Sequence, residues 1–153
     1  MTTAESVPST PRGQYSRESI AASTDQLEFL IDTAPATGFD IDYVESLEEA
    51  LRRMHARFRI HRARDLDAAE SERQLPPELV ETQDRLREEH TALLGHLDRL
   101  IRSVPSMADR PHDDNEVFIL RVRELIAILR RHLAEEDRLL YLALWHDTGG
   151  EAG

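Results

Sequence analysis

One helical stripe near the C-terminus constrains the fold of this chain more than any other feature. Over residues 117–143, positions three and four apart carry apolar side chains, with two exceptions that lie one helical turn apart, His132 and Glu136. The full stripe is Phe118, Val122, Leu125, Leu129, His132, Glu136, Leu139 and Ala143. A helix that buries this stripe also buries a carboxylate, which is costly unless its charge is compensated. Two interpretations follow. The pair holds a metal ion inside a helical bundle, or a His–Glu hydrogen bond fills a polar gap in the core.

Two earlier segments show the same interruption of an apolar stripe by a histidine. The first of these stripes is Val44, Leu47, Leu51, Met54, Phe58, His61, Asp65 and Ala68. The second is Gln83, Leu86, His90, Leu93, Leu97, Leu100 and Val104. His61 is followed by Asp65 at the spacing that separates His132 from Glu136, and His90 lies among leucines. Three converging histidines with two carboxylates favour a metal site over separate polar core residues.

The composition indicates an all-α protein. Charged residues make up 32 % of the chain and aromatic residues only 5 %, and almost no segment alternates between apolar and polar residues with a period of two. A chain of 153 residues suits one domain with a substantial core. Residues 1–16, rich in Ser, Thr, Pro and Gly, are predicted to be a disordered lead, and residues 148–153 a tail. The domain itself is predicted to span residues 17–147.

Caps and breakers divide this domain into four predicted helices. The first is expected at about 17–33 and the second at about 43–73, capped by Asp42 together with Glu45. Two prolines at positions 76 and 77 open the third helix, where proline is tolerated in the first turn. A loop is expected at 103–115, after which Asp113 and Glu116 are predicted to cap the last helix.

Net charge and cysteine content exclude several classes of function. The charge of −11 argues against binding to nucleic acid and to anionic membrane surfaces. The sequence has no apolar run long enough for a transmembrane helix and no secretory signal pattern, so we expect a cytoplasmic protein. With no cysteine, any metal ligands must be His, Asp or Glu.

The other four histidines are predicted to be structural or surface residues. His96 is expected to face solvent, because its neighbours at helical spacing include Glu89 and Arg99. His55 flanks the second stripe but has an arginine four residues later, where a carboxylate ligand would be needed. His112 lies in the predicted loop and His146 close to the end of the last helix.

The pattern of histidines and acids resembles the hemerythrin-like (HHE cation-binding) domains. The segments EEHTALLGHLDRL and LRRHLAEEDRLL carry most of the likeness, above all HLAEED, where that family has a histidine followed by acids four and five residues later. The resemblance covers roughly residues 17–147. It implies an antiparallel, up-down-up-down four-helix bundle around a non-haem di-iron centre. Carried over by motif, the implied ligands are His61, Asp65, His90, His132 and Glu136, and Asp137 is a possible bridging acid.

Two features depart from the family pattern. The family has a histidine on its first helix, whereas here no histidine occurs before position 55. Glu28 or Asp32 on the predicted first helix is a possible oxygen ligand in its place. Asp65 is also shorter than the glutamate that the family usually has, and an alignment on His55 instead of His61 would put Arg59 at the acid position. A mononuclear iron site is therefore an alternative to a di-iron one.

The ligand set leads to two functional hypotheses. Mixed imidazole and carboxylate ligands suit iron, with manganese and zinc as alternatives. Open coordination positions would bind O2, NO or peroxide, so the first hypothesis is an iron protein that binds or senses such a ligand or handles iron. The second is a metal-free bundle that serves as a protein-interaction module. No nucleophile arrangement or phosphate-binding glycine loop is present, so we do not expect a dedicated metabolic enzyme.

Overall fold

Four long helices make up the structure. The computed structural model describes residues 12–70 and 75–147, and it places side chains for residues 17–64 and 75–145. In chain order the helices are α1 (Arg12–Asp32), α2 (Ile41–Glu70), α3 (Pro77–Ser103) and α4 (His112–Asp147), with the 3-10 helix η1 (Val104–Asp109) between the last two. No strand occurs in these residues. Within the same residues, no helix combines the length and apolar character needed to cross a membrane.

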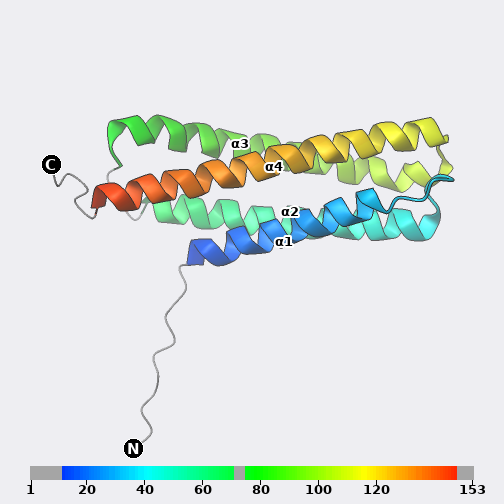
Figure 1. The fold of residues 1–153 in the computed structure, drawn as a ribbon, viewed down its shortest axis with the longest axis horizontal. Coiled ribbons are helices and arrows are strands. Elements are labelled where there is room, and N and C mark those ends of the chain that lie inside the picture. Colours follow the sequence, from blue (N-terminus) through cyan, green and yellow to red (C-terminus); the bar gives the residue numbers. More distant parts are fainter. Residues whose placement is uncertain (1–11, 71–74, 148–153) are drawn as a thin grey trace, which may run out of the picture.

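The helices lie side by side along the length of the molecule (Figure 1). Each helix contacts the next one along the chain, and α1 also contacts α4, which closes the bundle. Short connections join consecutive helices, so neighbouring helices run in opposite directions. The predicted all-α fold and up-down four-helix bundle are confirmed.

The predicted stripes form the core of this bundle. In α2, α3 and α4 their apolar members are buried along most of the helix, and α1 adds Ile20, Leu27 and Ile31. The inner side of α1 also includes two small polar residues, Ser23 and Thr24, which are buried. Thr24 Oγ1 donates a hydrogen bond to the Ile20 carbonyl at 2.8 Å, so its hydroxyl is satisfied within the helix.

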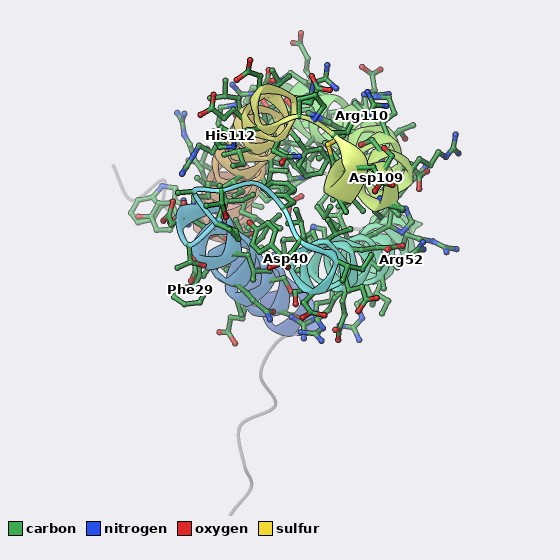
Figure 2. All side chains as sticks on the ribbon, turned by 90° about the vertical axis from the view of Figure 1, so that its right-hand side faces the viewer. Phe29, Asp40, Arg52, Asp109, Arg110 and His112 are labelled. Carbon is green, nitrogen blue, oxygen red and sulfur yellow. The ribbon has the colours of Figure 1, made fainter. Side chains whose placement is uncertain are left out.

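Figure 2 shows the end of the bundle at which the α1–α2 connection and the segment between α3 and α4 lie. One buried side chain ties these two connections together. Asn115 in the first turn of α4 accepts a hydrogen bond from the Phe39 amide at 3.1 Å through Oδ1. Its Nδ2 donates to the Met107 carbonyl of η1 at 2.9 Å. Both polar ends of a buried amide are thereby satisfied. This bond network fixes the end of the bundle where α1 turns into α2.

The caps of two helices differ from the prediction. Asp40, rather than Asp42, caps α2, because Asp40 Oδ1 accepts the Tyr43 N–H at 2.7 Å. Asp42 lies exposed inside the first turn. Similarly, α4 begins at His112 and includes Asp113 in its first turn. Both segments have more than one acid close to the helix start, so the cap depends on where the backbone becomes helical rather than on residue type.

Helix ends also differ from the prediction. α1 begins at Arg12, before the predicted start at about 17, and α2 begins at Ile41. The predicted loop at 103–115 contains the 3-10 helix η1, Val104–Asp109. The remaining part of the predicted lead, 1–11, and the predicted tail, 148–153, lie outside the described residues. The proposed domain boundaries therefore stay predictions.

A tyrosine joins α1 to α2 near the same end. Tyr43 Oη donates a hydrogen bond to the Leu30 carbonyl at 2.6 Å, and its ring packs on Phe39 with centroids 4.7 Å apart. Burial raises the pKa of Tyr43 to about 12, and the nearby Arg123 lowers it by a smaller amount. The folded state therefore favours the neutral phenol that donates this bond.

This pKa predicts a specific loss of stability at alkaline pH. In the unfolded chain Tyr43 ionises near its usual pKa of 10.0, so its contribution is complete below pH 10 and is lost as the pH rises towards about 12. At neutral pH we expect Tyr43→Phe to lower the free energy of unfolding by about 1 kcal/mol. Between pH 10 and about 12 the difference in free energy of unfolding between the variant and the parent should become smaller and disappear. Urea denaturation at neutral pH and at a pH within this alkaline range measures the difference.

Two features allow the pH dependence to be assigned to Tyr43. The chain has no lysine and no cysteine, so tyrosines are its main groups titrating in this range. Tyr141, which is 64 % exposed, provides the control Tyr141→Phe, for which we expect no pH-dependent difference. A gap between parent and Tyr43→Phe that is the same at both pH values would contradict the prediction.

Candidate metal centre

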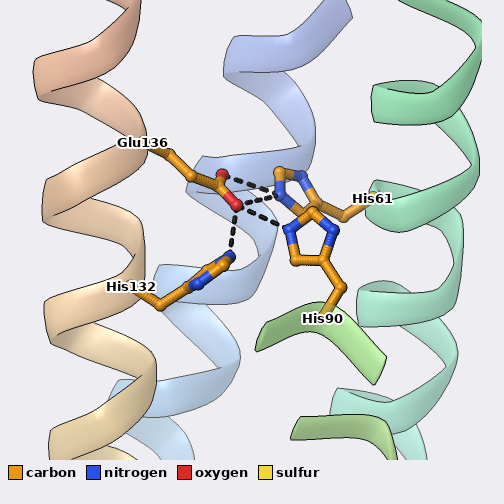
Figure 3. Close-up of side chains that lie close together, drawn as sticks. All are labelled: His61, His90, His132 and Glu136. Atoms are coloured by element: carbon orange, nitrogen blue, oxygen red, sulfur yellow. Dashed lines mark hydrogen bonds and ion pairs between the residues drawn. The ribbon is translucent and has the colours of Figure 1, made fainter. Parts of the chain in front are cut away.

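Three helices bring four titratable side chains together in the core. His61 of α2, His90 of α3, and His132 and Glu136 of α4 have exposed fractions of 1 %, 1 %, 1 % and 8 %. Each continues the apolar stripe of its helix, so the packing that buries the leucines also buries these groups. Figure 3 shows the three imidazoles directed at the Glu136 carboxylate. The helix phase predicted from the sequence is right at these four positions.

Glu136 lies at the centre of the cluster. Its Oε1 is 2.7 Å from His90 Nε2 and 3.0 Å from His61 Nε2. Its Oε2 is 2.8 Å from His61 Nε2, and His132 Nε2 also lies against Oε1. A single carboxylate oxygen thus faces three imidazole nitrogens, although it has only two lone pairs to offer. One oxygen cannot accept a full hydrogen bond from each of three nitrogens, so hydrogen bonding alone does not account for their convergence.

His132 has the clearest orientation. Its Nδ1 is 2.9 Å from Glu89 Oε2, so we assign the ring proton to Nδ1. Its buried Nε2 touches Glu136 without the alignment of a hydrogen bond and makes no other one within the described residues. Nε2, the ring nitrogen on the side away from Glu89, is therefore directed into the cluster. A carboxylate behind an imidazole is the usual way in which proteins orient a histidine towards a metal.

Phe58 separates the cluster from the rest of the core. Its ring centroid lies 5.8 Å from that of His61, 5.4 Å from that of His90 and 6.0 Å from that of His132. The ring is fully buried. An aromatic wall next to all three imidazoles keeps the local dielectric low, which strengthens every charge interaction inside the cluster.

The cluster shifts the ionisation of its members. Burial alone would raise the pKa of Glu136, but the contacts with His132, His61 and His90 outweigh it and hold that pKa well below the usual range. For His132, burial disfavours the charged ring, whereas Glu136 and Glu89 favour it and raise its pKa overall. The carboxylate is therefore ionised at neutral pH. A buried negative charge that attracts cations is thus a fixed property of the site.

The structure adds Glu89 and its partner Arg85 to the predicted site. Glu89 is assigned to the solvent side by helical spacing, but it is only 26 % exposed and bonds to His132 across the α3–α4 interface. Arg85 Nη1 lies 3.2 Å from Glu89 Oε1, and Arg85 Nη2 lies 2.8 Å from Glu135 Oε2. Helical period identifies the buried face, but it does not show which flanking side chains reach a neighbouring helix.

Three further acids considered as ligands do not join the cluster. Asp137 is 65 % exposed and pairs with Arg17 at 2.8 Å. Asp32 pairs with Arg123 at 2.8 Å on the surface between α1 and α4. The third acid, Glu28, lies on the same surface of α1 and pairs with Arg130 of α4.

The first helix contributes no ligand within its described side chains. Glu28 pairs with Arg130, so α1 residues near position 28 lie level with α4 near position 130. The Arg17–Asp137 pair aligns the start of α1 with α4 beyond the cluster. Between these two pairs, the buried members of α1 are Ile20, Ser23, Thr24 and Leu27, none of them a metal ligand of the kind sought. Glu28 and Asp32 are therefore wrong as substitutes for the family's first-helix histidine.

The side chain of Asp65 lies outside the described residues, so its predicted role as a ligand stays a prediction. Among the other histidines, His55 pairs with Asp98 at 3.2 Å and His112 with Glu116 at 3.3 Å. His96 is partly buried rather than fully solvent-facing. The side chain of His146 is also outside the described part.

The cluster has the dimensions of a site for one metal ion. The four donor atoms all lie within 4.8 Å of one another. Two ligands on opposite sides of one ion, each bonded at about 2.1 Å, lie about 4.2 Å apart. The four donors are therefore close enough together to hold a single ion. Two ions about 3.5–4 Å apart would need further bridging ligands. The described residues bring no His, Asp or Glu donor to this cluster beyond the four named.

Fold and site together define the class of this protein: a four-helix bundle with a buried three-histidine, one-glutamate group that could hold a metal ion. No protein-family model, no curated protein and no solved structure matches the chain. The hemerythrin-like resemblance therefore rests on the residues described above, and no family is assigned to the chain. Metal identity does not follow from the cluster alone.

A matched pair of substitutions tests whether His90, rather than His96, is the histidine of α3 that faces the cluster. His90→Ala removes a buried partner of Glu136, so we expect the free energy of unfolding to fall by about 1–3 kcal/mol in the presence of chelator. His96→Ala, at a partly buried position outside the cluster, should change it by about 0.5 kcal/mol or less. Urea denaturation of both variants gives the comparison, and equal losses would contradict the assigned geometry.

Proposed function

We propose that this protein is a hemerythrin-like metal protein that binds one divalent transition-metal ion, preferably iron, through His61, His90, His132 and Glu136. The observation that carries the proposal is the convergence of three Nε2 atoms from three helices on one buried carboxylate oxygen. A metal ion held there would be bound by the Nε2 atoms of the three imidazoles. Its positive charge would also compensate the buried negative charge of Glu136.

The donor set supports iron, with manganese and zinc as alternatives. Imidazole and carboxylate ligands without sulfur suit these ions and disfavour calcium and magnesium, which prefer oxygen alone. The resemblance to hemerythrin-like domains adds weight to iron. A single ion is proposed in place of a di-iron centre, because only four donors gather in the cluster. Asp65 is proposed as a further ligand for the same ion.

The proposed activity is the binding or sensing of a small ligand. The four clustered donors would leave two positions of an octahedral ion open, or one if Asp65 also binds, and O2, NO or peroxide would bind there. The protein's own residues support this role in two ways. Phe58 keeps the region behind the cluster apolar, and Glu89 holds the proton of His132 at Nδ1, which leaves Nε2 as the ligand atom.

A second candidate function is a metal-free bundle that docks a partner protein. One observation favours it: the end of α4 carries several exposed apolar side chains. These are Leu140, Tyr141, Leu144 and Trp145, with exposed fractions of 42 %, 64 %, 49 % and 54 %. In this alternative the imidazoles alone compensate the charge of Glu136. The two functions differ in what removal of that charge does to stability.

The substitution Glu136→Gln separates them. With iron(II) bound, the variant loses an anionic ligand, so metal occupancy and melting temperature should both fall relative to the parent. In a metal-free core the same substitution removes the charged partner of three imidazoles, so the melting temperature should fall by the same amount with and without iron. If the site binds metal, we expect the loss in melting temperature to be larger in the presence of anaerobic iron(II) than after chelator treatment.

Metal content by elemental analysis and melting by circular dichroism are measured on both proteins. Glu124→Gln, an exposed change of the same charge on the same helix, serves as the control and should affect neither quantity. The parent should bind one ion per chain. A loss in melting temperature that iron does not enlarge, together with unchanged metal content, would defeat the metal function and leave the fold intact.

Glu89 provides a test that leaves all four proposed ligands in place. Glu89→Gln keeps the size of the side chain but weakens its hold on His132 Nδ1. Loss of such a contact behind a metal-binding histidine typically weakens metal binding by about 10–100-fold. Glu88→Gln, an exposed neighbour on α3, is the matched control. Competition with a chelator of known affinity measures both, and equal affinities would show that Glu89 does not orient the ligand.

A further inference from the structure

A partly open cavity of about 190 Å³ lies directly beside the cluster. Both His90 and Glu136 form part of its wall, so anything bound in it would contact the candidate metal ligands. Its apolar wall comes from the chain just before α3, from α3 and from the end of α4. These residues are Leu75, Leu86, Leu139, Leu140 and Ala143. The half-buried end of the α4 stripe is therefore the surface of a binding cavity.

The size of the cavity exceeds what a diatomic ligand needs. A cavity of about 150 Å³ lined by apolar side chains is enough to bind benzene. The cavity of about 190 Å³ next to Glu136 thus accommodates an apolar body as large as one six-membered ring with a small substituent. O2 or NO would fill only a small part of this space.

The charged residues of the cavity favour an anion. Arg17 and Arg87 both line it, and their side chains are only 16 % and 31 % exposed. Arg17 uses Nε to bind Asp137, which leaves the other donors of its guanidinium. Arg87 Nη1 is 3.7 Å from the exposed Asp84, too far for a hydrogen bond. Among the residues that line the cavity, the two arginines outnumber the one carboxylate, Glu136, in a chain whose net charge is −11.

From this combination we infer that the cavity binds a small monocarboxylic acid with an apolar body about the size of one ring. Its carboxylate pairs with the guanidinium of Arg87, with Arg17 beside it, because arginine presents two parallel donors that match a carboxylate. Its apolar body packs on Leu86 and Leu139 and extends towards Glu136. The inference names a ligand class for the proposed metal centre and rests on it for its biological role. Binding itself requires no metal.

Benzoate is the probe for this inference. Calorimetric titration compares benzoate with benzyl alcohol, which has the ring without the charge, and with sulfate, which has charge without the ring. We expect saturable binding of benzoate alone, to chelator-treated and to iron-loaded protein. Comparable binding of benzyl alcohol would overturn the role of the arginines, and comparable binding of sulfate would overturn the role of the apolar wall. No saturation with benzoate up to about 10 mM would overturn the inference as a whole.

Three variants locate the bound probe. Arg87→Gln should weaken benzoate binding about tenfold or more, the effect of losing one charge-assisted hydrogen bond. Arg99→Gln, an exposed arginine on the same helix, should leave it unchanged. Ala143→Phe adds a ring to the cavity wall without changing charge and should abolish binding while the circular dichroism spectrum stays helical. Equal effects of the two arginine substitutions, or full binding by Ala143→Phe, would place benzoate elsewhere and refute the inference.

The metal dependence separates this inference from the proposed function. Benzoate that binds only to iron-loaded protein, with no effect of Arg87→Gln, would mean that its carboxylate binds the metal, which contradicts the orientation inferred here. Benzoate that binds chelator-treated protein supports the inference even if no metal ever binds. Iron binding without benzoate binding supports only the metal function.

Discussion

The ionised carboxylate of Glu136 is the interaction on which the arrangement of the bundle depends. Among the described residues it is the only buried carboxylate, and it lies in a core that consists mainly of aliphatic and aromatic side chains. Leaving such a charge unpaired would cost several kcal/mol, a large part of the stability of a domain of this size. The charge therefore requires His61 and His90 to come within hydrogen-bond distance from two other helices. Packing and charge compensation specify the same alignment of α2, α3 and α4.

This requirement also fixes how far the helices can slide. A shift of one helical turn along α3 would move His90 away from Glu136 and bring a leucine to the carboxylate. Apolar stripes alone tolerate such a shift, because one leucine packs much like the next. The polar cluster therefore sets the register of the bundle near one end, and the buried Asn115 network sets it at the other. Between them lies a core of leucine, methionine and phenylalanine.

Helical period predicts most of the fold and the inner members of the cluster. The stripes place His61, His90, His132 and Glu136 correctly, because a buried face repeats every three to four residues. Glu89 escapes this reasoning, since it flanks the stripe of α3 and reaches its partner on α4 sideways. Interhelical pairs of this kind depend on how two helices are rotated about their axes. No periodicity within one helix contains that information.

Local signals fail where several similar residues compete. Two acids near the start of α2 have equivalent chemistry, and only the backbone makes Asp40 the cap. Likewise Glu28 and Asp137 have the right residue type for a ligand, but arginines on a neighbouring helix hold them at the surface. The cavity beside the cluster is also invisible in sequence, because the residues of its wall come from three separate segments. Such features arise only when the helices assemble.

The absence of a ligand on α1 among its described side chains has a consequence for how this sequence can change over evolutionary time. The cluster is held by α2, α3 and α4, whereas the buried residues of α1 at about the same level of the bundle are Ile20, Ser23, Thr24 and Leu27. Selection on the candidate metal ligands therefore acts on three helices and not on α1. Such a helix can drift in sequence, or acquire a ligand by a single substitution at its inner face. Chemistry at the site can thus diversify from the one side that does not yet take part in it.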